Sequence, residues 1–328
     1  MKTLALFNNK GGVGKTSLTY HLGYMFAELG HRVLFADLDP QANLSTMCLS
    51  ERRIEAVWSL KPRPTIYGAI ERLRRGVGDV DRIAPEAVTG SIGLVVGDLQ
   101  LSEIEDDLSQ QWPKCLDRDE RAFRVTTAFH RVVAQAAERT GADIALLDVG
   151  PNFGAINRAA LIAADHVVVP VAPDLFSMQG LENVGPRLST WRDQWKDRKA
   201  RAPELDFAIP NGTMHPLGYV VSRHSVLAGG AVKAFQKWID RMPAVYRESF
   251  SKPIPNEGIE VGSDEFCLGQ LKDYRSLMPM AQEAKKPMFL LKPADGAIGG
   301  HQGAVRQAYA DFHALATQVL ERMGVPPA

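Results

Sequence analysis

The chain has 328 residues, of which 45% are hydrophobic and 23% are charged. This length and composition suffice for a large α/β domain with a full core and exclude extensive disorder. Lys plus Arg and Asp plus Glu each number 38, so the formal net charge is zero, which disfavours a protein wrapped in nucleic acid but permits a local basic patch.

Cysteine usage and hydropathy indicate where the chain works. Cys48, Cys115 and Cys267 lie far apart and form no C-x-x-C pair, which predicts a reducing, cytoplasmic environment without a disulfide framework or zinc site. No apolar run approaches the length of a membrane span, so we expect no membrane partner. The first residues enter a strand at once, which predicts no signal peptide.

A glycine-rich loop follows the first predicted strand, Leu4–Phe7, and leads into a helix that ends near Gly30. Glycines allow backbone N–H groups to converge on phosphate oxygens at a helix N-terminus. A lysine there reaches the β- and γ-phosphates, and a following hydroxyl can bind Mg²⁺. A plain glycine-rich turn is the alternative, but the strand, glycines, lysine, threonine and helix all agree with a nucleotide site. The predicted nucleotide-binding residues are Lys10, Gly11, Gly12, Val13, Gly14, Lys15, Thr16 and Ser17.

Lys10 departs from the common phosphate-loop pattern, which also has Gly where this chain has Asn9. Because Lys15 already serves the phosphates, Lys10 lacks a role within one subunit. One interpretation is a lysine that crosses a two-fold interface to the partner's phosphates, like an arginine finger. The other is a surface lysine attracted to the nucleotide charge.

Acidic residues end two further predicted strands. Asp37 and Asp39 follow Arg32–Ala36, and Asp148 follows Ile144–Leu147. A carboxylate at the end of a strand can hold Mg²⁺ opposite a phosphate loop, and Asp39 can position the attacking water. Both acidic segments also read as turns. The predicted magnesium site comprises Thr16, Asp39 and Asp148, and the predicted catalytic residues are Lys10, Lys15 and Asp39.

The rest of the chain alternates between strand-like and helical segments. Strands are predicted at Ile92–Val96, His166–Pro170 and Leu217–Val221, with a poorly patterned region at about 50–90. One long helix is expected over 117–140, and a final helix over Gly303–Met323. This order predicts a doubly wound α/β fold, a mostly parallel sheet with helices on both faces. We expect one domain over 1–328 that includes a mostly helical insertion at about 190–285.

Four segments resemble the ParA branch of the deviant-Walker-A ATPases, whose relatives include MinD, Soj-type partition proteins and the nitrogenase iron protein. They are Lys10–Ser17, Asp37-Leu-Asp39-Pro-Gln-Ala-Asn43, the strand end at Asp148 and Val167–Pro173. The resemblance covers about residues 1–185 and returns loosely in the last 55. The sequence Asp148-Val-Gly-Pro151 departs from the family's usual Asp-Thr-x-Pro.

The resemblance implies ATP and Mg²⁺ as cofactors and an ATP-bound sandwich dimer. Lys10 would act across the interface, Lys15 and Thr16 would bind phosphate and Mg²⁺, and Asp39 would act on the water. Ser222 and Arg223 occupy the approximate place of adenine contacts.

Features elsewhere narrow the choice within the family. The last residues, Glu321–Ala328, are not expected to form the amphipathic helix of a MinD-like membrane binder. Cys115 lacks the partner cysteine that the cluster of an iron protein requires. The helix-turn-helix of larger plasmid partition proteins is not expected before Thr3. A partition ATPase remains, one that binds DNA non-specifically as an ATP dimer on the nucleoid and meets a ParB-like stimulating partner. The alternatives are a nucleotide-switched scaffold that does not bind DNA and a biosynthetic P-loop enzyme, for which no second substrate motif is legible.

Three basic clusters could contact DNA phosphates, although a cluster of this kind is more often a solvated helix face. The clusters are Arg72/Arg74/Arg75, Arg118/Arg121/Arg124 and Lys196/Arg198/Lys199/Arg201.

Overall fold

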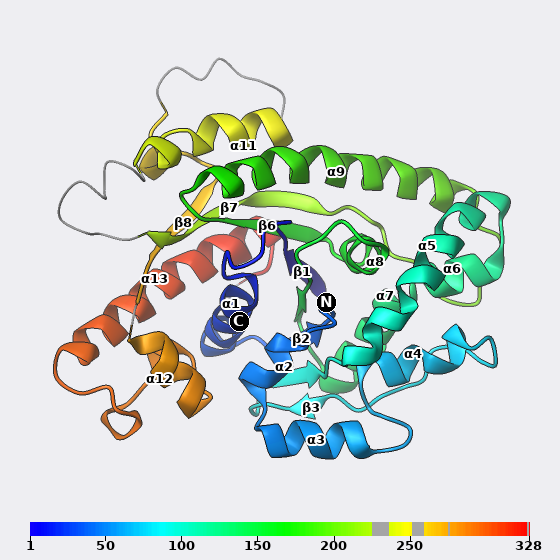
Figure 1. The fold of residues 1–328 in the computed structure, drawn as a ribbon, viewed down its shortest axis with the longest axis horizontal. Helices are drawn as coiled ribbons and strands as arrows, with labels where there is room; N and C mark the ends of the chain where they lie inside the picture. Colours follow the sequence, from blue (N-terminus) through cyan, green and yellow to red (C-terminus); the bar gives the residue numbers. More distant parts are fainter. Residues whose placement is uncertain (225–235, 251–258, 275, 327) are drawn as a thin grey trace.

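An eight-stranded sheet runs through the computed structural model, which describes residues 1–224, 236–250, 259–274, 276–326 and 328. The strand order is β3-β4-β2-β5-β1-β6-β7-β8, and every pairing is parallel except β3 with β4 (Figure 1). The strands are β1 (Lys2–Leu6), β2 (Val33–Asp37), β3 (Glu86–Ala87), β4 (Ile92–Val95), β5 (Ile144–Asp148), β6 (His166–Val171), β7 (His215–His224) and β8 (Cys267–Lys272).

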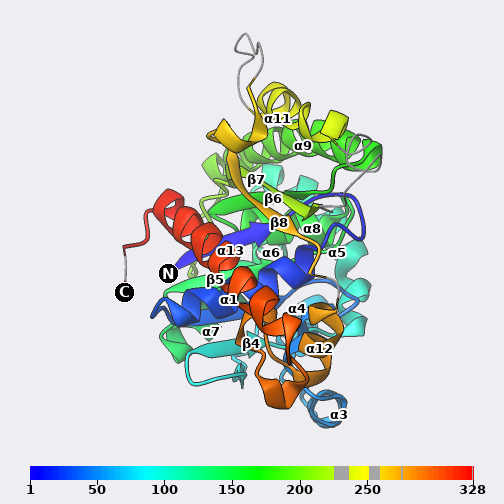
Figure 2. The same ribbon diagram turned by 90° about the vertical axis from the view of Figure 1, so that its left-hand side faces the viewer.

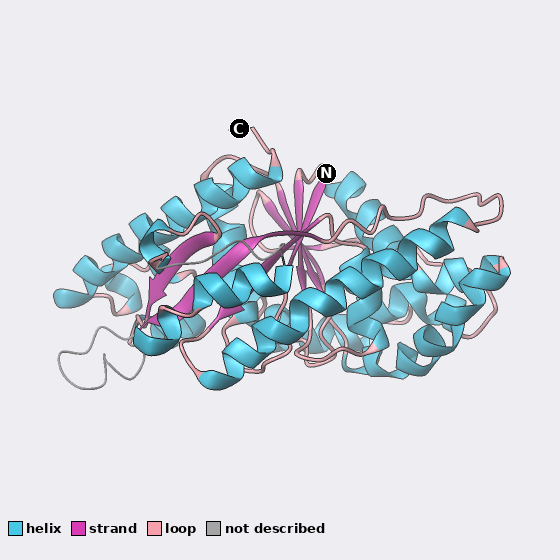
Figure 3. Ribbon diagram, turned by 90° about the horizontal axis from the view of Figure 1, so that it is seen from above, coloured by secondary structure: helices cyan, strands magenta, loops and turns pink. Residues whose placement is uncertain are grey.

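Helices cover both faces of the sheet, as Figure 3 shows in a view from above. Successive side chains of a strand point to opposite faces. Leu4 and Leu6 therefore pack in the cluster that contains α1 and α13, whereas Ala5 and Phe7 pack in the cluster that contains α7, α8 and α9. The predicted doubly wound α/β class is confirmed. The α-helices are α1 (Lys15–Glu28), α2 (Asn43–Cys48), α3 (Glu51–Ser59), α4 (Ile66–Arg74), α5 (Glu105–Lys114), α6 (Glu120–Thr126), α7 (Ala128–Thr140), α8 (Ala155–Ile162), α9 (Leu175–Ala200), α11 (Met242–Phe250), α12 (Leu277–Ala284) and α13 (Gly300–Met323).

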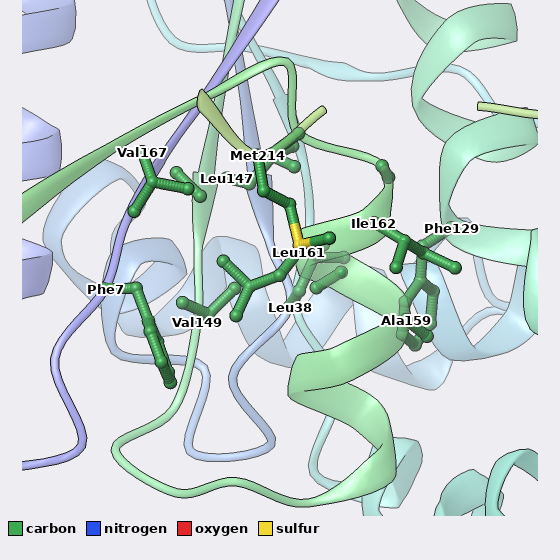
Figure 4. Packing of buried hydrophobic residues seen from close by; sticks show 14 of the residues in the cluster. Phe7, Leu38, Phe129, Leu147, Val149, Ala159, Leu161, Ile162, Val167 and Met214 are labelled. Carbon is green, nitrogen blue, oxygen red and sulfur yellow. The ribbon is translucent and has the colours of Figure 1, made fainter. Parts of the chain in front are cut away.

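Buried side chains surround the end of β5, the strand that ends at Asp148. Leu147 and Val149 belong to the same hydrophobic cluster as Leu161 of α8 (Figure 4). All three side chains are at most 1% exposed. Close packing of this kind resists displacement, so the end of β5 is held rigidly relative to its neighbours.

His21 joins the helix that follows the glycine-rich loop to the C-terminal part of the chain. Its Nδ1 lies 2.7 Å from Ser17 O, and its Nε2 accepts from Met288 N at 3.1 Å. The ring also stacks on Phe312 of α13, which lies beside α1 in Figures 1 and 2. Because Nε2 accepts, the proton of the neutral ring must be on Nδ1.

This buried histidine makes stability depend on pH. Burial lowers the pKa of His21 from 6.5 to about 4. As pH falls, His21 is therefore protonated in the unfolded chain before it is protonated in the folded protein. The contribution of neutral His21 to the free energy of unfolding is fully present above pH 6.5 and is lost as pH falls toward 4. Urea unfolding at several pH values measures this effect. Between pH 6.5 and pH 4, the free energy of unfolding should decrease by about 3 kcal/mol more for wild type than for His21→Gln. Parallel pH profiles for the two proteins would refute this role of His21.

The helix expected over 117–140 is wrong in one respect, because the structure has two helices there. Thr127 ends α6 and begins α7 with φ −101° and ψ 9°. Its hydroxyl donates to Phe123 O at 2.7 Å. A side-chain bond of this kind to the preceding turn competes with continuation of the helix.

The region at 50–90 contains two helices that the pattern did not predict. Ser50 and Thr65 are their N-caps, accepting from Arg53 N at 3.3 Å and Gly68 N at 3.1 Å. Ser and Thr are common N-cap residues and can mark the start of a helix. The helices were not predicted because the apolar residues of this region lack regular helical spacing.

Strand β8 was also not predicted, and it joins the sheet inside the segment assigned to an insertion. That segment, 190–285, begins within α9, contains β7 and β8, and ends just after α12. Residues 225–235, 251–258 and 275 of this segment lie outside the described residues. The assignment of the whole chain to one domain stays a prediction.

Candidate functional site

The glycine-rich loop joins β1 to α1 in a conformation that requires glycine. Gly12 and Gly14 have φ of +75° and +86°, a region that other residues rarely adopt. Gly14 is the N-cap of α1 and offers no side chain to the free N–H groups of the first turn. These groups are therefore available to an anion at the positive end of the helix.

Lys15 is the first residue of α1, directly after this loop, and is only 7% exposed. Its Nζ donates to Lys10 O at 3.1 Å, and Asp148 and Asp39 are its carboxylate neighbours. Burial lowers the pKa of Lys15, and the two carboxylates oppose that shift. The structure thus places these three predicted residues together.

Three parallel strands end at the loop and bring the acidic residues to one edge. Asp148 is paired in register with Leu6 of β1 on one side and with Asp37 of β2 on the other. Asp39 follows β2, is 7% exposed, and accepts from Gln41 N at 3.0 Å through Oδ1. This is the strand-end arrangement that the sequence predicts.

Asp148 has features expected of a cation ligand. The side chain is fully buried, and neither carboxylate oxygen makes a well-formed hydrogen bond among the described residues, although the Thr16 hydroxyl is a neighbouring donor. Burial, followed by the Asp37 carboxylate, raises the pKa of Asp148, while Thr16 and Lys15 oppose this. Buried polar atoms are almost always satisfied, so two unpaired oxygens beside Thr16 fit a bound cation or its water.

The site lacks a complete set of protein ligands for a metal. In the described ranges, no cluster of three or more His, Cys, Asp and Glu side chains could hold a metal ion. Mg²⁺ is usually bound by one or two carboxylates together with substrate phosphates. The donor set therefore fits Mg²⁺ only together with a phosphate ligand.

Asp37 has a different role from Asp39. It is fully buried, and its Oδ2 accepts from Ser45 N at 2.7 Å and Ser45 Oγ at 2.8 Å. Burial raises its pKa to about 7 although the Ser45 hydrogen bonds oppose the shift. Asp37 thereby fixes α2 against the strand that ends at the site, a role that the sequence analysis missed.

Lys10 contacts its own chain in this structure. Its Nζ donates to Asp174 Oδ2 at 2.6 Å and to Ser177 Oγ at 3.2 Å. Asp174 and Ser177 belong to the start of α9, more than 160 residues away in the chain. Neither residue was predicted from the sequence, although Asp is a preferred N-cap residue at the start of a helix.

Asn8 is a second functional residue that the sequence analysis missed. Its side chain is buried, accepts from Lys10 N at 3.0 Å and donates to Pro170 O at 2.8 Å. Helix α9 approaches closely here, because a Cβ on Gly180 would lie 2.5 Å from Asn8 Oδ1. Asn8 therefore ties the start of the loop to the end of β6.

A cavity of about 110 Å³ opens beside the loop. Ser222 of β7 lines it and donates to Val13 O at 2.8 Å. The side chain of Arg223, the other predicted adenine contact, lies outside the described residues. The cavity is also lined by Gly14, Ser17, Leu271, Tyr274, Met278, Met288 and Phe312.

Four of the ten basic side chains in the three clusters form ion pairs with carboxylates within the described residues. Arg72, Arg74 and Arg75 pair with Asp81, Glu103 and Glu71. Arg124 pairs with Asp79, Glu120 and Asp206. Arg198 is 7% exposed and donates to Trp112 O at 2.8 Å, and Lys199 donates to Asn211 Oδ1 at 2.8 Å.

Together, the parallel sheet, the anion-binding loop and the strand-end carboxylates define a P-loop nucleotide-binding protein. The family described as AAA domain (AAA_31) matches residues 1–199, more than half of the chain, and the chain belongs to this family.

None of the helices in the described parts of the chain is long and apolar enough to cross a membrane.

Relatives and solved structures agree with the resemblance to ParA. The chain is 32% identical to Protein IncC of Escherichia coli over 200 residues, 59% of this chain and 47% of IncC. It is 29% identical to the chromosome partitioning protein ParA of Caulobacter vibrioides over 181 residues, 55% of this chain and 60% of that protein. The chain thus spans about half the length of the curated relatives it matches.

The likeness in fold extends beyond the matched segment. The structure of a McdA–ATP complex from Cyanothece has a TM-score of 0.65 and 17% identity, covering 100% of this chain and 98% of that one. The predicted relationship to ParA-type ATPases of the MinD/ParA superfamily is confirmed. The individual roles assigned to site residues stay predictions.

Proposed function

We propose that this protein is a partition ATPase that binds ATP and Mg²⁺, pairs with a second copy in the ATP-bound state and hydrolyses ATP to ADP and phosphate. The observation that carries the proposal is the convergence of Lys15, Asp39 and Asp148 at the phosphate loop, with Lys10 beside them. The relatives named as partition proteins support the same reading.

Each residue then has a distinct task. Lys15 and the N–H groups of Gly11–Ser17 bind the phosphates, and Thr16 and Asp148 hold Mg²⁺, which neutralises phosphate charge when bound. Asp39 orients the attacking water. Lys10 stabilises the charge that develops on the phosphates held by the partner subunit.

The cavity beside the loop supplies a place for the base. It adjoins Gly14 and Ser17, so a nucleotide whose phosphates lie on the loop can extend into it. Met278 and Phe312 offer apolar contact, which suits an aromatic base.

Size-exclusion chromatography with light scattering tests the dimer. Asp39→Ala should trap ATP and elute as a dimer with ATP and Mg²⁺, whereas Lys10→Ala should stay monomeric. ADP should leave both proteins monomeric. A monomeric Asp39→Ala that demonstrably holds ATP would refute the sandwich dimer.

We further propose that the ATP dimer binds DNA without sequence preference and that a ParB-like protein stimulates hydrolysis. Dimerisation adds two modest basic surfaces, which reconciles DNA binding with zero net charge. Retention of DNA should require ATP and decrease steeply with salt. DNA retention that does not depend on ATP would contradict this.

A scaffold that positions a protein complex without touching DNA is the second candidate. This candidate is favoured because some side chains of the basic clusters already have partners within the protein and are less available to DNA phosphates. Arg72, for example, pairs with Asp81, and Arg198 donates to Trp112 O. A gel-shift assay with ATP and Mg²⁺ separates the candidates, because only the partition ATPase should retard DNA.

A further inference from the structure

The Lys10 amine contacts the N-terminal turn of α9 in its own chain. Besides its bonds to Asp174 Oδ2 and Ser177 Oγ, the amine lies 6.0 Å from the centre of the Phe176 ring. The Lys10 backbone is fixed independently, since its N–H donates to Asn8 Oδ1. The loop can therefore hold its place whether or not the Lys10 side chain stays on α9.

This arrangement conflicts with the task assigned to Lys10 in the dimer. Two of the three N–H groups of the Lys10 amine already donate to Asp174 and Ser177 of its own chain, so these bonds must be given up before the amine can turn fully to phosphates held by another copy. We propose that Asp174 and Ser177 form a latch that keeps Lys10 within its own subunit and thereby raises the ATP concentration at which two copies pair. This inference rests on the proposed function, because it concerns the same lysine.

Asp174 uses its two oxygens for two separable purposes. Oδ1 accepts from Ser177 N at 2.9 Å and caps α9, whereas Oδ2 accepts from Lys10. Burial alone raises the pKa of Asp174, but the hydrogen bonds and charge of Lys10 and Ser177 outweigh it and lower the pKa overall. The carboxylate is thus ionised at neutral pH and available as a counter-charge.

The Lys10–Asp174 ion pair can break because both side chains reach solvent. The side chains of Lys10 and Asp174 are 28% and 34% exposed, so water can solvate both charges when the pair separates. Ion pairs of this exposure change an equilibrium by about two- to fivefold. A triphosphate carries more negative charge than one carboxylate, so a partner's nucleotide can outcompete Asp174.

Asp174→Asn separates the two purposes of this residue. Asparagine caps helices as well as aspartate does, so α9 keeps its N-terminus, but the charge that attracts Lys10 is gone. In an Asp39→Ala background, the ATP concentration at half-dimerisation should fall about two- to fivefold. Analytical ultracentrifugation across an ATP titration measures this midpoint, and ATP affinity measured at protein concentrations below pairing should not change.

Asp119→Asn is the matched control, because Asp119 caps α6 in the same way and lies outside the site. It should leave the midpoint unchanged. The effect of Asp174→Asn should also shrink between about 50 mM and 500 mM salt, since exposed ion pairs are screened. A purely structural role in α9 would not respond to salt in this way.

The outcomes separate the latch from the dimer. If Asp39→Ala pairs with ATP but Asp174→Asn leaves the midpoint unchanged or raises it, the latch is refuted and the proposed dimer stands. If Asp39→Ala binds ATP and never pairs, both proposals fall together. A lowered midpoint with the expected salt dependence supports both.

Discussion

Replacing Lys10 with alanine is expected to reduce ATP turnover by about 10³-fold, within the range reported for arginine fingers. The reason is that a cation supplied by the partner would neutralise charge that develops on the transferred phosphate. ATP binding by the monomer should persist, because Lys15 and the loop N–H groups contact the phosphates independently of the Lys10 amine. Steady-state phosphate release at saturating ATP measures turnover, and a fluorescent ATP analogue measures binding.

Lys114→Ala provides the control for loss of a lysine, since Lys114 is exposed at the end of α5, away from the loop. It should turn over ATP like wild type. Mixing Lys10→Ala with an inactive protein that retains Lys10, such as Lys15→Ala, should restore part of the activity if Lys10 acts across the interface. Wild-type turnover by Lys10→Ala alone would eliminate the lysine from catalysis.

The site residues that were predicted from the sequence are those whose signals are local. The glycines, Lys15 and Thr16 are consecutive, and Asp39 and Asp148 follow strands with continuous apolar runs. Because parallel strands end at one edge of a sheet, strand ends alone place these acids near the loop. The register of Asp148 with Leu6 and Asp37 bears out the strand-end placement.

The residues that were missed act through contacts between distant parts of the chain. Asp174 meets Lys10 across 164 positions, and Ser45 reaches Asp37 only after α2 folds back on β2. No spacing rule links such pairs. The role of Asp37 could not be predicted because Asp39, two residues later, has the same carboxylate chemistry. In the structure the two differ in that Asp37 is fully buried and accepts from Ser45.

The fold was predicted least well where the elements lack a clean pattern. Strand β8 contains Gly269, and its residues alternate irregularly between buried and exposed; within the described residues it lies at the sheet edge beside β7. Helix α9 continues through Pro186 into a charge-rich end, so composition suggested a boundary near 190 where the helix has none.

Asp148→Asn is expected to reduce Mg²⁺-dependent ATP turnover strongly and yet to stabilise the protein without nucleotide. The variant removes the carboxylate that we assign to the metal, so turnover should fall on the order of 10²–10³-fold. The same carboxylate is buried, unpaired and next to Asp37, which costs free energy whenever it is ionised. Removing the charge should raise the free energy of unfolding by on the order of 1 kcal/mol, about 1–2 °C in Tm for a chain of this length.

The sign of the pH dependence follows from the raised pKa of Asp148. The folded protein holds the proton to higher pH than the unfolded chain, so this contribution to wild-type stability is lost as pH rises above about 4. The asparagine variant does not titrate there, and its advantage in Tm should therefore grow from pH 5 to pH 8. Adding Mg²⁺ and ATP should reverse the order, because ligand binding stabilises the wild type more strongly.

Asp98→Asn is the matched control for this experiment. Asp98 is also a buried carboxylate just beyond a strand, but it accepts from Gln100 N at 3.0 Å and Thr65 Oγ1 at 2.9 Å and pairs with Arg63. Its replacement should lower Tm, because it breaks satisfied bonds instead of relieving an unpaired charge. If Asp148→Asn lowers Tm in the same way without nucleotide, the carboxylate stabilises the empty site, and its unpaired oxygens do not indicate a place for a cation.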